Sequence, residues 1–400
     1  MTRAVFSGAQ IFDGTGAALA EGDVLVEEGR ILEVGPGLEG DEEVDLTGGT
    51  ILPGLFDCHT HVMVSHIDFW KLVQTPFSFA FFEAGHNLAA TLAIGITTIR
   101  DAGGADLGVK TAVERGLIPG PRMQISVGMI SQTGGHGDGW MPSGSWVRLF
   151  PVHPGRPDTM VDGPEEMRRK VRELVRYGAD VIKVATSGGV LSPRDKPTHP
   201  HFSMEELEML VAEARAAGIW VMAHAQATQG IKNAVRAGIR SIDHGVYLDD
   251  EAIELMKEHR AFLVPTLVAP TGVLRAAEQG ASIPEVAKQK AAEVVDVHRE
   301  SFRRAVEAGV KVAMGTDSGV TPHGENLLEL ELMVEGGMTP GQALVATTSS
   351  AAELMGLNGE LGTIEVGKRA DLVVVEGDPF DFKTLGERVT AVYMDGRQVV

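Results

Sequence analysis

The 400-residue sequence contains a single cysteine, Cys58, so no disulfide can form within the chain. Basic residues are scarce: 35 Lys and Arg stand against 55 Asp and Glu, and the formal net charge of -20 argues against a nucleic-acid partner. No run reaches the roughly 18 apolar residues of a membrane span, and the N-terminal segment lacks the apolar core of a signal peptide. We therefore expect a cytoplasmic protein that binds neither nucleic acid nor a membrane.

Hydrophobic residues make up 44% of the sequence and charged residues 22%, the proportions of an ordinary globular protein. Residues 1–56 consist of short β-like segments separated by Gly and Asp, and residues 359–400 return to the same pattern. This pattern predicts that the two ends of the chain combine into one small β-sandwich domain. The intervening residues 57–358 would form a second domain.

Short apolar runs alternate with amphipathic segments through this second region. In PEEMRRKVRELVRYG, for example, Met167, Val171 and Leu174 fall at helical spacing with charges between them. Such alternation predicts an α/β fold in which helices cover a parallel sheet. Eight apolar runs can be counted, the number that closes a (β/α)8 TIM barrel, although an open doubly wound sheet fits the alternation as well.

Ionisable residues stand at the ends of most of these apolar runs. His59 and His61 lie two residues apart, so both would face one side of a strand, where one could simply be packed and the other exposed. Active sites of barrels lie at the C-terminal ends of the strands, and nitrogen ligands with a carboxylate suit Zn²⁺ and related ions. In chain order the residues at these ends are His59, His61, Arg100, Asp101, Lys183, His224, His244 and Asp317.

Lys183 needs a separate explanation, because an ammonium group cannot bind a metal ion. A buried lysine near positive charge loses its proton readily. The neutral amine can then add CO2 and form a carbamate, whose two oxygens are able to bridge two metal ions. The spacing of the residues permits this chemistry but does not establish it.

The combination of His-Thr-His at 59–61 with Lys183 and the later ligands resembles the amidohydrolase superfamily. The segments ILPGLFDCHTH and GKRADLVVVEGDP extend the resemblance over essentially the whole chain. The segments TTIRDAGG, GGHGDG, ADVIKVATSGG, SIDHG and GTDSGVTPHGEN resemble the branch that contains Xaa-Pro dipeptidases and related metal-dependent carboxypeptidases. Imidazolonepropionases show a more distant resemblance in the same kinds of segment.

The resemblance implies a barrel enzyme with two divalent metal ions, expected to be Zn²⁺. Carried over residue by residue, the metal ligands are His59, His61, Lys183, His224, His244 and Asp317. The first histidine pair and Asp317 would hold the more buried ion, the second pair would hold the other, and N6-carboxylated Lys183 would bridge them. A hydroxide between the ions would attack the substrate, with Asp317 as the catalytic general base and then general acid.

The expected substrate is a small molecule, a Xaa-Pro-like dipeptide or an N-acyl amino acid, and the resemblance also implies a homo-oligomer. His136 in GGHGDG and His323 in TPHGEN are expected to bind the substrate, and residues 187–203 are expected to form a lid or pocket wall. Several relatives have an aromatic residue where this chain has Gln226, and Tyr247 could replace it.

Two other classes of protein remain open. A ring-opening hydrolase of cyclic amides, similar to imidazolonepropionases, or a xenobiotic amide hydrolase would use the same ligands. A mononuclear deaminase fits less well, because such enzymes usually lack the bridging lysine. A non-enzymatic scaffold would be expected to have lost at least one ligand, and this chain has all six.

Overall fold

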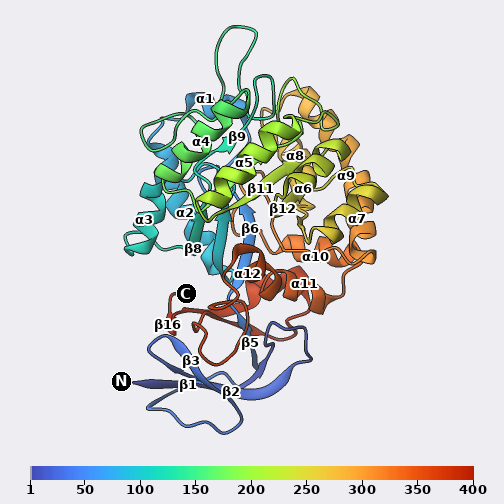
Figure 1. The fold of residues 1–400 in the computed structure, drawn as a ribbon. Coiled ribbons are helices and arrows are strands. Elements are labelled where there is room, and N and C mark those ends of the chain that lie inside the picture. Colours follow the sequence, from blue (N-terminus) through green and yellow to red (C-terminus); the bar gives the residue numbers. More distant parts are fainter. Residues whose placement is uncertain (1) are drawn as a thin grey trace.

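A computed structural model describes residues 2–400 of the protein. Figure 1 shows a β-sheet that contains both ends of the chain, with a larger region above it in which helices surround strands. The α/β class predicted from the alternation is confirmed. Within the described residues, no helix combines the length and the apolar content needed to cross a membrane.

The terminal segments form one eight-stranded mixed sheet with the order β16-β15-β14-β5-β1-β2-β3, and β4 pairs with β1. The two ends of the chain meet where β14 pairs antiparallel with β5. Glu28 and Gly29 connect β2 to β3 with φ angles of 50° and 77°, as a tight hairpin turn of this hand requires. The strands are β1 (Arg3–Ile11), β2 (Ala20–Glu27), β3 (Arg30–Gly35), β4 (Glu42–Asp45), β5 (Gly49–Pro53), β14 (Leu372–Glu376), β15 (Val389–Met394) and β16 (Arg397–Gln398).

The strands of the larger region pair in parallel in two sheets, β6-β7-β8 and β9-β10-β11-β12-β13. They are buried on both faces, which explains why they read as continuous apolar runs. Isolated parallel bridges join Leu263 to Val312 and Thr60 to Ser318, so the segment 312–318 contacts both sheets. The strands are β6 (Leu55–Thr60), β7 (Ile96–Asp101), β8 (Arg122–Ile125), β9 (Met129–Ile130), β10 (Val181–Ala185), β11 (Trp220–Ala225), β12 (Ser241–His244) and β13 (Phe262–Val264).

Most of the helices bury an apolar face against the rest of this region, whereas α1 has no buried residue. In α4 the buried residues include Met167, Val171 and Leu174, as their spacing predicted. The helices are α1 (Phe69–Gln74), α2 (Phe79–Ala93), α3 (Leu107–Glu114), α4 (Pro164–Arg176), α5 (Met204–Ala216), α6 (Thr228–Ala237), α7 (Asp250–Glu258), α8 (Val268–Glu278), α9 (Glu285–Glu307), α10 (Leu328–Glu335), α11 (Pro340–Ala346), α12 (Ser349–Met355) and the 3-10 helix η1 (Phe382–Arg388).

Candidate metal centre and active site

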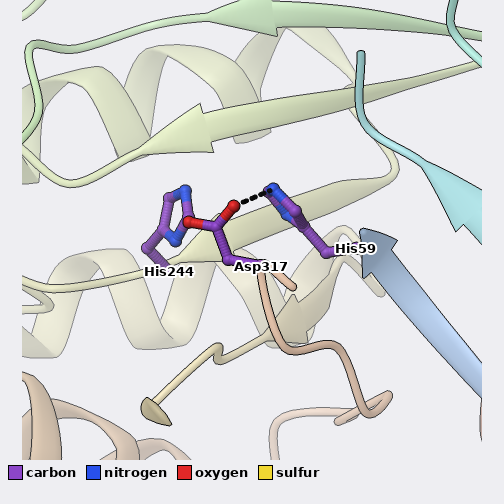
Figure 2. Close-up of side chains that lie close together, drawn as sticks. All are labelled: His59, His244 and Asp317. Atoms are coloured by element: carbon purple, nitrogen blue, oxygen red, sulfur yellow. Dashed lines mark ion pairs between the residues drawn. The ribbon is translucent and has the colours of Figure 1, made fainter. Parts of the chain in front are cut away.

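The first two histidines of the site lie at the end of β6: His59 is its second-last residue and His61 directly follows the strand. His59 and His61 are both buried, and their Nε2 atoms lie 3.4 Å and 3.1 Å from Oδ1 of Asp317. His244 completes the group: His59, His244 and Asp317 each offer one ligand atom, and these atoms all lie within 4.8 Å of one another. Figure 2 shows the carboxylate of Asp317 between the two imidazoles. Three segments far apart in the sequence therefore meet at one point.

The backbone at two of these residues is unusual. Asp317 and His244 have φ angles of 62° and 73°, in the left-handed region that residues other than glycine rarely adopt. The amide of Asp317 donates to the carbonyl of His59 at 2.7 Å, which holds this conformation. Backbone strain of this kind concentrates at functional sites, because the surrounding structure must stabilise it.

Electrostatics keep Asp317 ionised. Burial alone would raise the pKa of this carboxyl, but the adjacent His59 and His61 outweigh burial and hold the pKa well below its usual range. For His61, burial alone would lower the pKa, and the hydrogen bond and charge of Asp317 raise it above the usual value. The cluster thus supplies an anionic oxygen among imidazole nitrogens, the ligand types that divalent transition metals prefer.

In both His224 and His244, one ring nitrogen forms a hydrogen bond to the described part of the chain and the other does not. Nε2 of His224 donates to the carbonyl of Gly188 at 3.1 Å, which leaves Nδ1 free to bind a metal ion. Nδ1 of His244 lies 2.7 Å from Oγ1 of Thr266, which leaves Nε2 free. Burial lowers the pKa of both imidazoles well below the usual value; Lys183 and neighbouring imidazoles add to this effect, and at His244 the carboxylates of Asp317 and Asp243 oppose it without reversing it. Both rings are therefore neutral and present a lone pair, as metal ligands must.

Lys183 extends from β10 into the same site and is almost completely buried. Its Nζ donates to Oδ2 of Asp243 at 2.6 Å, and the same oxygen lies 3.1 Å from Nδ1 of His59. Burial lowers the pKa of Lys183, although Asp243 opposes this shift. For Asp243, burial alone would raise the pKa, but Lys183, His59 and Arg100 outweigh it and the pKa lies far below its usual value.

Asp243 is the main site residue that the sequence reasoning missed. It is fully buried and precedes His244 in SIDHG, so alternation along a strand would place the two side chains on opposite faces. Both contact the site because strand geometry ends at His244, where φ is positive. The only available signal was an acidic residue inside a run of buried strand residues, which is rare unless the charge is paired.

Arg100 and Asp101, two of the residues at the strand ends, hold the backbone beside the metal ligands, and Arg100 also lies 3.5 Å from Oδ1 of Asp243. Nε of Arg100 donates to the carbonyl of Cys58 at 2.7 Å. Asp101 accepts hydrogen bonds from the amide of Val62 at 2.9 Å and from the amide of Gly103 at 3.0 Å. The carbonyl of Gly103 in turn accepts a hydrogen bond from Nδ1 of His61. The end of β6 and the segment that follows it are thereby anchored to the end of β7.

A cavity of about 180 Å³ opens onto these residues. Its floor contains the candidate ligands, and its walls come from the loops that follow β6, β9 and β10 and from helices α1 and α8. The predicted pocket-wall role of residues 187–203 agrees with this placement, since residues 190–193 line the cavity. Apolar wall residues include Ile67, Phe69, Leu72, Leu149, Phe150, Val190, Leu191, Val246, Val273 and Val320.

One cation in the wall has no carboxylate partner. Arg156 is 3% exposed and donates to the carbonyl of Pro151 at 3.0 Å and 2.7 Å and to the carbonyl of Gly104. Within residues 2–400, no acidic side chain forms an ion pair with it, whereas Arg148 nearby pairs with Asp158 at 2.9 Å. Burial lowers the pKa of Arg156 to about 10, so it stays charged near neutral pH. The charges of Asp101 and Asp106 oppose the effect of burial, but neither carboxylate forms an ion pair with Arg156, and burying such a charge is costly unless a partner is supplied.

The two predicted substrate-contact histidines lie in different places. His136 lines the cavity and stacks on His224, with ring centroids 4.0 Å apart and an interplanar angle of 16°. His323 is not among the residues that line the cavity, and its Nε2 donates to the carbonyl of Val64 at 3.0 Å. Gln226 lines the cavity and Tyr247 does not.

The comparisons with known proteins agree with this geometry. A family model described as the amidohydrolase family matches residues 50–399. Ochratoxinase of Aspergillus niger is 36% identical over 364 residues, 87% of this chain and 75% of that protein. A solved Xaa-Pro dipeptidase with methionine bound in its active site has a TM-score of 0.90 at 33% identity and covers 99% of both chains. A prolidase complexed with N-methylphosphonate-L-proline has a TM-score of 0.90 at 36% identity and covers 100% of this chain and 99% of that one. The chain therefore belongs to the amidohydrolase family, as the strand-end residues predicted, and it is a hydrolase that acts on carbon–nitrogen bonds.

Proposed function

We propose that this hydrolase is a binuclear metal enzyme that cleaves the amide bond of Xaa-Pro-like dipeptides or N-acyl amino acids. The observation that carries the proposal is the convergence of His59, His244 and Asp317 at the floor of an apolar cavity. The names of two similar structures, a Xaa-Pro dipeptidase and a prolidase, support the same substrate class.

The residues present fit two divalent ions, for which Zn²⁺ is our choice. His59, His61 and Asp317 would hold one ion, and Nδ1 of His224 with Nε2 of His244 would hold the other. The lowered pKa of Lys183 favours the neutral amine, the form that adds CO2, so this side chain suits a carbamate bridge between the two sites. Asp243 would remain as the buried carboxylate beneath them.

The chain's own groups account for proton transfer during amide hydrolysis. Bound divalent ions would supply Lewis acidity and lower the pKa of water. The ionised carboxylate of Asp317 would take a proton at Oδ1 or Oδ2 from the attacking water and deliver it to the leaving nitrogen. Its depressed pKa, caused by His59 and His61, keeps it in the accepting form before substrate reacts.

The cavity supports a substrate with an apolar side chain and a free α-carboxylate. Apolar side chains such as Phe69, Leu149 and Val273 would enclose the side chain. Arg156, buried in the wall without an acidic partner, is the candidate to bind the carboxylate. Charge-assisted hydrogen bonds of this kind contribute about 1.5–3 kcal/mol each, or roughly ten- to a hundredfold in affinity.

We further propose that the two parallel sheets are arcs of one (β/α)8 barrel, with residues 57–358 as the barrel domain and residues 1–56 and 359–400 as the β-sandwich domain. The bridges from Leu263 to Val312 and from Thr60 to Ser318 support closure, since one segment reaches both sheets. In a closed barrel, the strand ends would face one pocket, as the site requires.

A substrate screen with metal-loaded enzyme tests the proposed function. We expect metal content near two ions per chain and turnover of Xaa-Pro dipeptides or N-acyl amino acids. Lys183→Ala should lose both metal and turnover, whereas Lys311→Ala, an exposed lysine paired with Glu353, should retain them. Turnover confined to cyclic amides would favour the ring-opening alternative, and a fully active, metal-loaded Lys183→Ala variant would refute the bridging role.

Carboxylate recognition has its own test. Each good substrate is compared with its C-terminal amide, in the wild type and in Arg156→Met. We expect the wild type to prefer the acid by at least about tenfold and the variant to lose most of that preference. Arg172→Met, which removes an exposed arginine paired with Glu213, is the matched control. An unchanged preference in Arg156→Met would assign the carboxylate to another group.

A further inference from the structure

A second network of buried polar groups lies beside the metal-ligand cluster, in the loop that follows β10. Nδ1 of His136 lies 3.0 Å from Oγ of Ser192, and that hydroxyl donates to Oδ1 of Asp195. Lys290, from α9, donates to the carbonyls of Gly189 and Ser192 at 3.1 Å and 2.7 Å and lies 3.5 Å from Asp195. All of these groups except His136 are at least nine-tenths buried.

The network determines which ring nitrogen of His136 carries the proton. A serine hydroxyl has one proton, and Oγ of Ser192 lies near two oxygen acceptors, Asp195 and the carbonyl of Gly189 at 3.1 Å. Because neither acceptor can donate, the proton of Ser192 is directed to one of them, and Oγ can only accept from His136. Nδ1 of His136 is therefore the protonated nitrogen, and Nε2 is left for the cavity that the ring lines.

The loop also fits closely around two imidazoles. A Cβ atom at Gly189 would lie 2.3 Å from Cε1 of His136 and 2.9 Å from Cε1 of His224, so only glycine is tolerated there. The adjacent carbonyl of Gly188 accepts a hydrogen bond from Nε2 of His224. Lys290 donates a hydrogen bond to the carbonyl of Gly189 and so fixes this turn. Helix α9, about 100 residues further along the chain, thereby helps to hold the rings of His136 and His224 in place.

The buried carboxylate of Asp195 indicates that this network does more than hold the loop in its conformation. Asp195 is buried and ionisable, and its Oδ2 has no hydrogen-bond partner within residues 2–400. The groups that face it are Lys290, the Ser192 hydroxyl, and the imidazoles of His136 and His201, whose nearest nitrogens lie 3.8 Å and 4.0 Å from Oδ2. A buried ion pair contributes little net stability compared with apolar packing, so its value lies in fixing one arrangement of the groups around it.

We propose that Ser192, Asp195 and Lys290 are positioning residues that fix His136 as the Nδ1-protonated imidazole, with Nε2 presented to the substrate above His224. The proposal rests on the proposed function for the identity of the substrate, but the state of the imidazole can be measured without one. Ser192 and Asp195 act through His136 and contact none of the candidate ligands His59, His244 and Asp317, although Ser192 also lines the cavity.

The first experiment uses protein labelled with ¹⁵N-histidine and loaded with Zn²⁺, with His136→Gln to assign the resonance. The ¹⁵N shifts of His136 should show a proton on Nδ1 in the wild type and a shift towards the Nε2-protonated form in Ser192→Ala. Thr198→Ala, an exposed position in the same loop, should leave the spectrum unchanged. An Nε2-protonated ring in the wild type, or an unaltered ring in Ser192→Ala, would overturn the proposal.

The second experiment measures turnover by the same zinc-loaded proteins. Ser192→Ala and Asp195→Asn should each lower kcat/KM by roughly tenfold at unchanged metal content, the usual size of an orienting effect. Ser192→Thr, which keeps the hydroxyl, should restore most of the activity, and Ser192→Ala should have little further effect in a His136→Ala background. Equal losses with and without His136, or loss of metal in Ser192→Ala, would indicate a purely structural loop and refute the proposal. If the wild type hydrolyses no dipeptide or N-acyl amino acid, the proposed function fails while the ¹⁵N result still decides the positioning role.

Discussion

Replacing Asp243 with Asn should destabilise the metal-free protein strongly, because it leaves Lys183 buried without its partner. Lys183 is 1% exposed and Asp243 is fully buried, and within residues 2–400 no other carboxylate lies within 4.0 Å of this lysine. Breaking a buried ion pair by removing one member typically costs about 3–5 kcal/mol.

The size of this effect has an upper limit that depends on pH. The stranded lysine can release its proton, and for an ordinary lysine pKa of about 10.4 this costs about 1.36 kcal/mol per pH unit below 10.4. The limit is therefore about 4.6 kcal/mol at pH 7 and about 1.9 kcal/mol at pH 9. Because Lys183 already has a lowered pKa, the measured values should lie at or below these limits.

The assay is urea unfolding of chelator-treated protein at pH 7 and at pH 9. We expect Asp243→Asn to lower the free energy of unfolding by about 3–4.5 kcal/mol at pH 7 and by less than about 2 kcal/mol at pH 9. The double variant with Lys183→Met should recover much of the loss, since it removes the stranded charge. Asp249→Asn, which removes a half-exposed partner of Lys232 while Glu251 remains paired with the same lysine, should cost less than about 1 kcal/mol. A loss below about 1 kcal/mol at pH 7, or one that does not shrink at pH 9, would refute the reasoning.

Three further predictions follow from the same geometry. Asp317→Asn should lower kcat by about 10²–10⁴-fold in steady-state assays, because it removes the proton acceptor; a loss of only a few-fold would assign the proton to another group. Gly189→Ala should cost at least about tenfold in kcat/KM, since its Cβ would lie 2.3 Å from Cε1 of His136, whereas Gly341→Ala, with no atom within 4 Å, should be neutral. Burial lowers the pKa of His298 from 6.5 to about 4. Between these pH values the imidazole binds a proton in the unfolded chain but not in the folded one. Stability should therefore fall as the pH is lowered through this range, by at most about 3 kcal/mol from this residue, and His298→Gln should show a correspondingly smaller fall in its urea midpoint.

The α/β class follows from local periodicity and was predictable from the sequence, whereas the roles of the candidate site residues were carried over from a family resemblance. Buried parallel strands read as apolar runs, and a helix such as α4 shows its buried face as residues at helical spacing. His59 and His244 interrupt those runs near strand ends, so their placement at one end of the strands could be expected before any contact was known, whereas Lys183 lies in the middle of β10.

The partners of those residues were decided only by the tertiary structure. Asp243 and Lys183 are 60 residues apart in the chain, and Ser192 and His136 are 56 apart, so no pattern within one strand or helix predicts either contact. Arg156 lies in an irregular loop where no period separates buried from exposed positions. Hydrogen bonds and ion pairs depend on distances of a few ångströms between side chains from different elements, whereas local sequence determines only the conformation of each element.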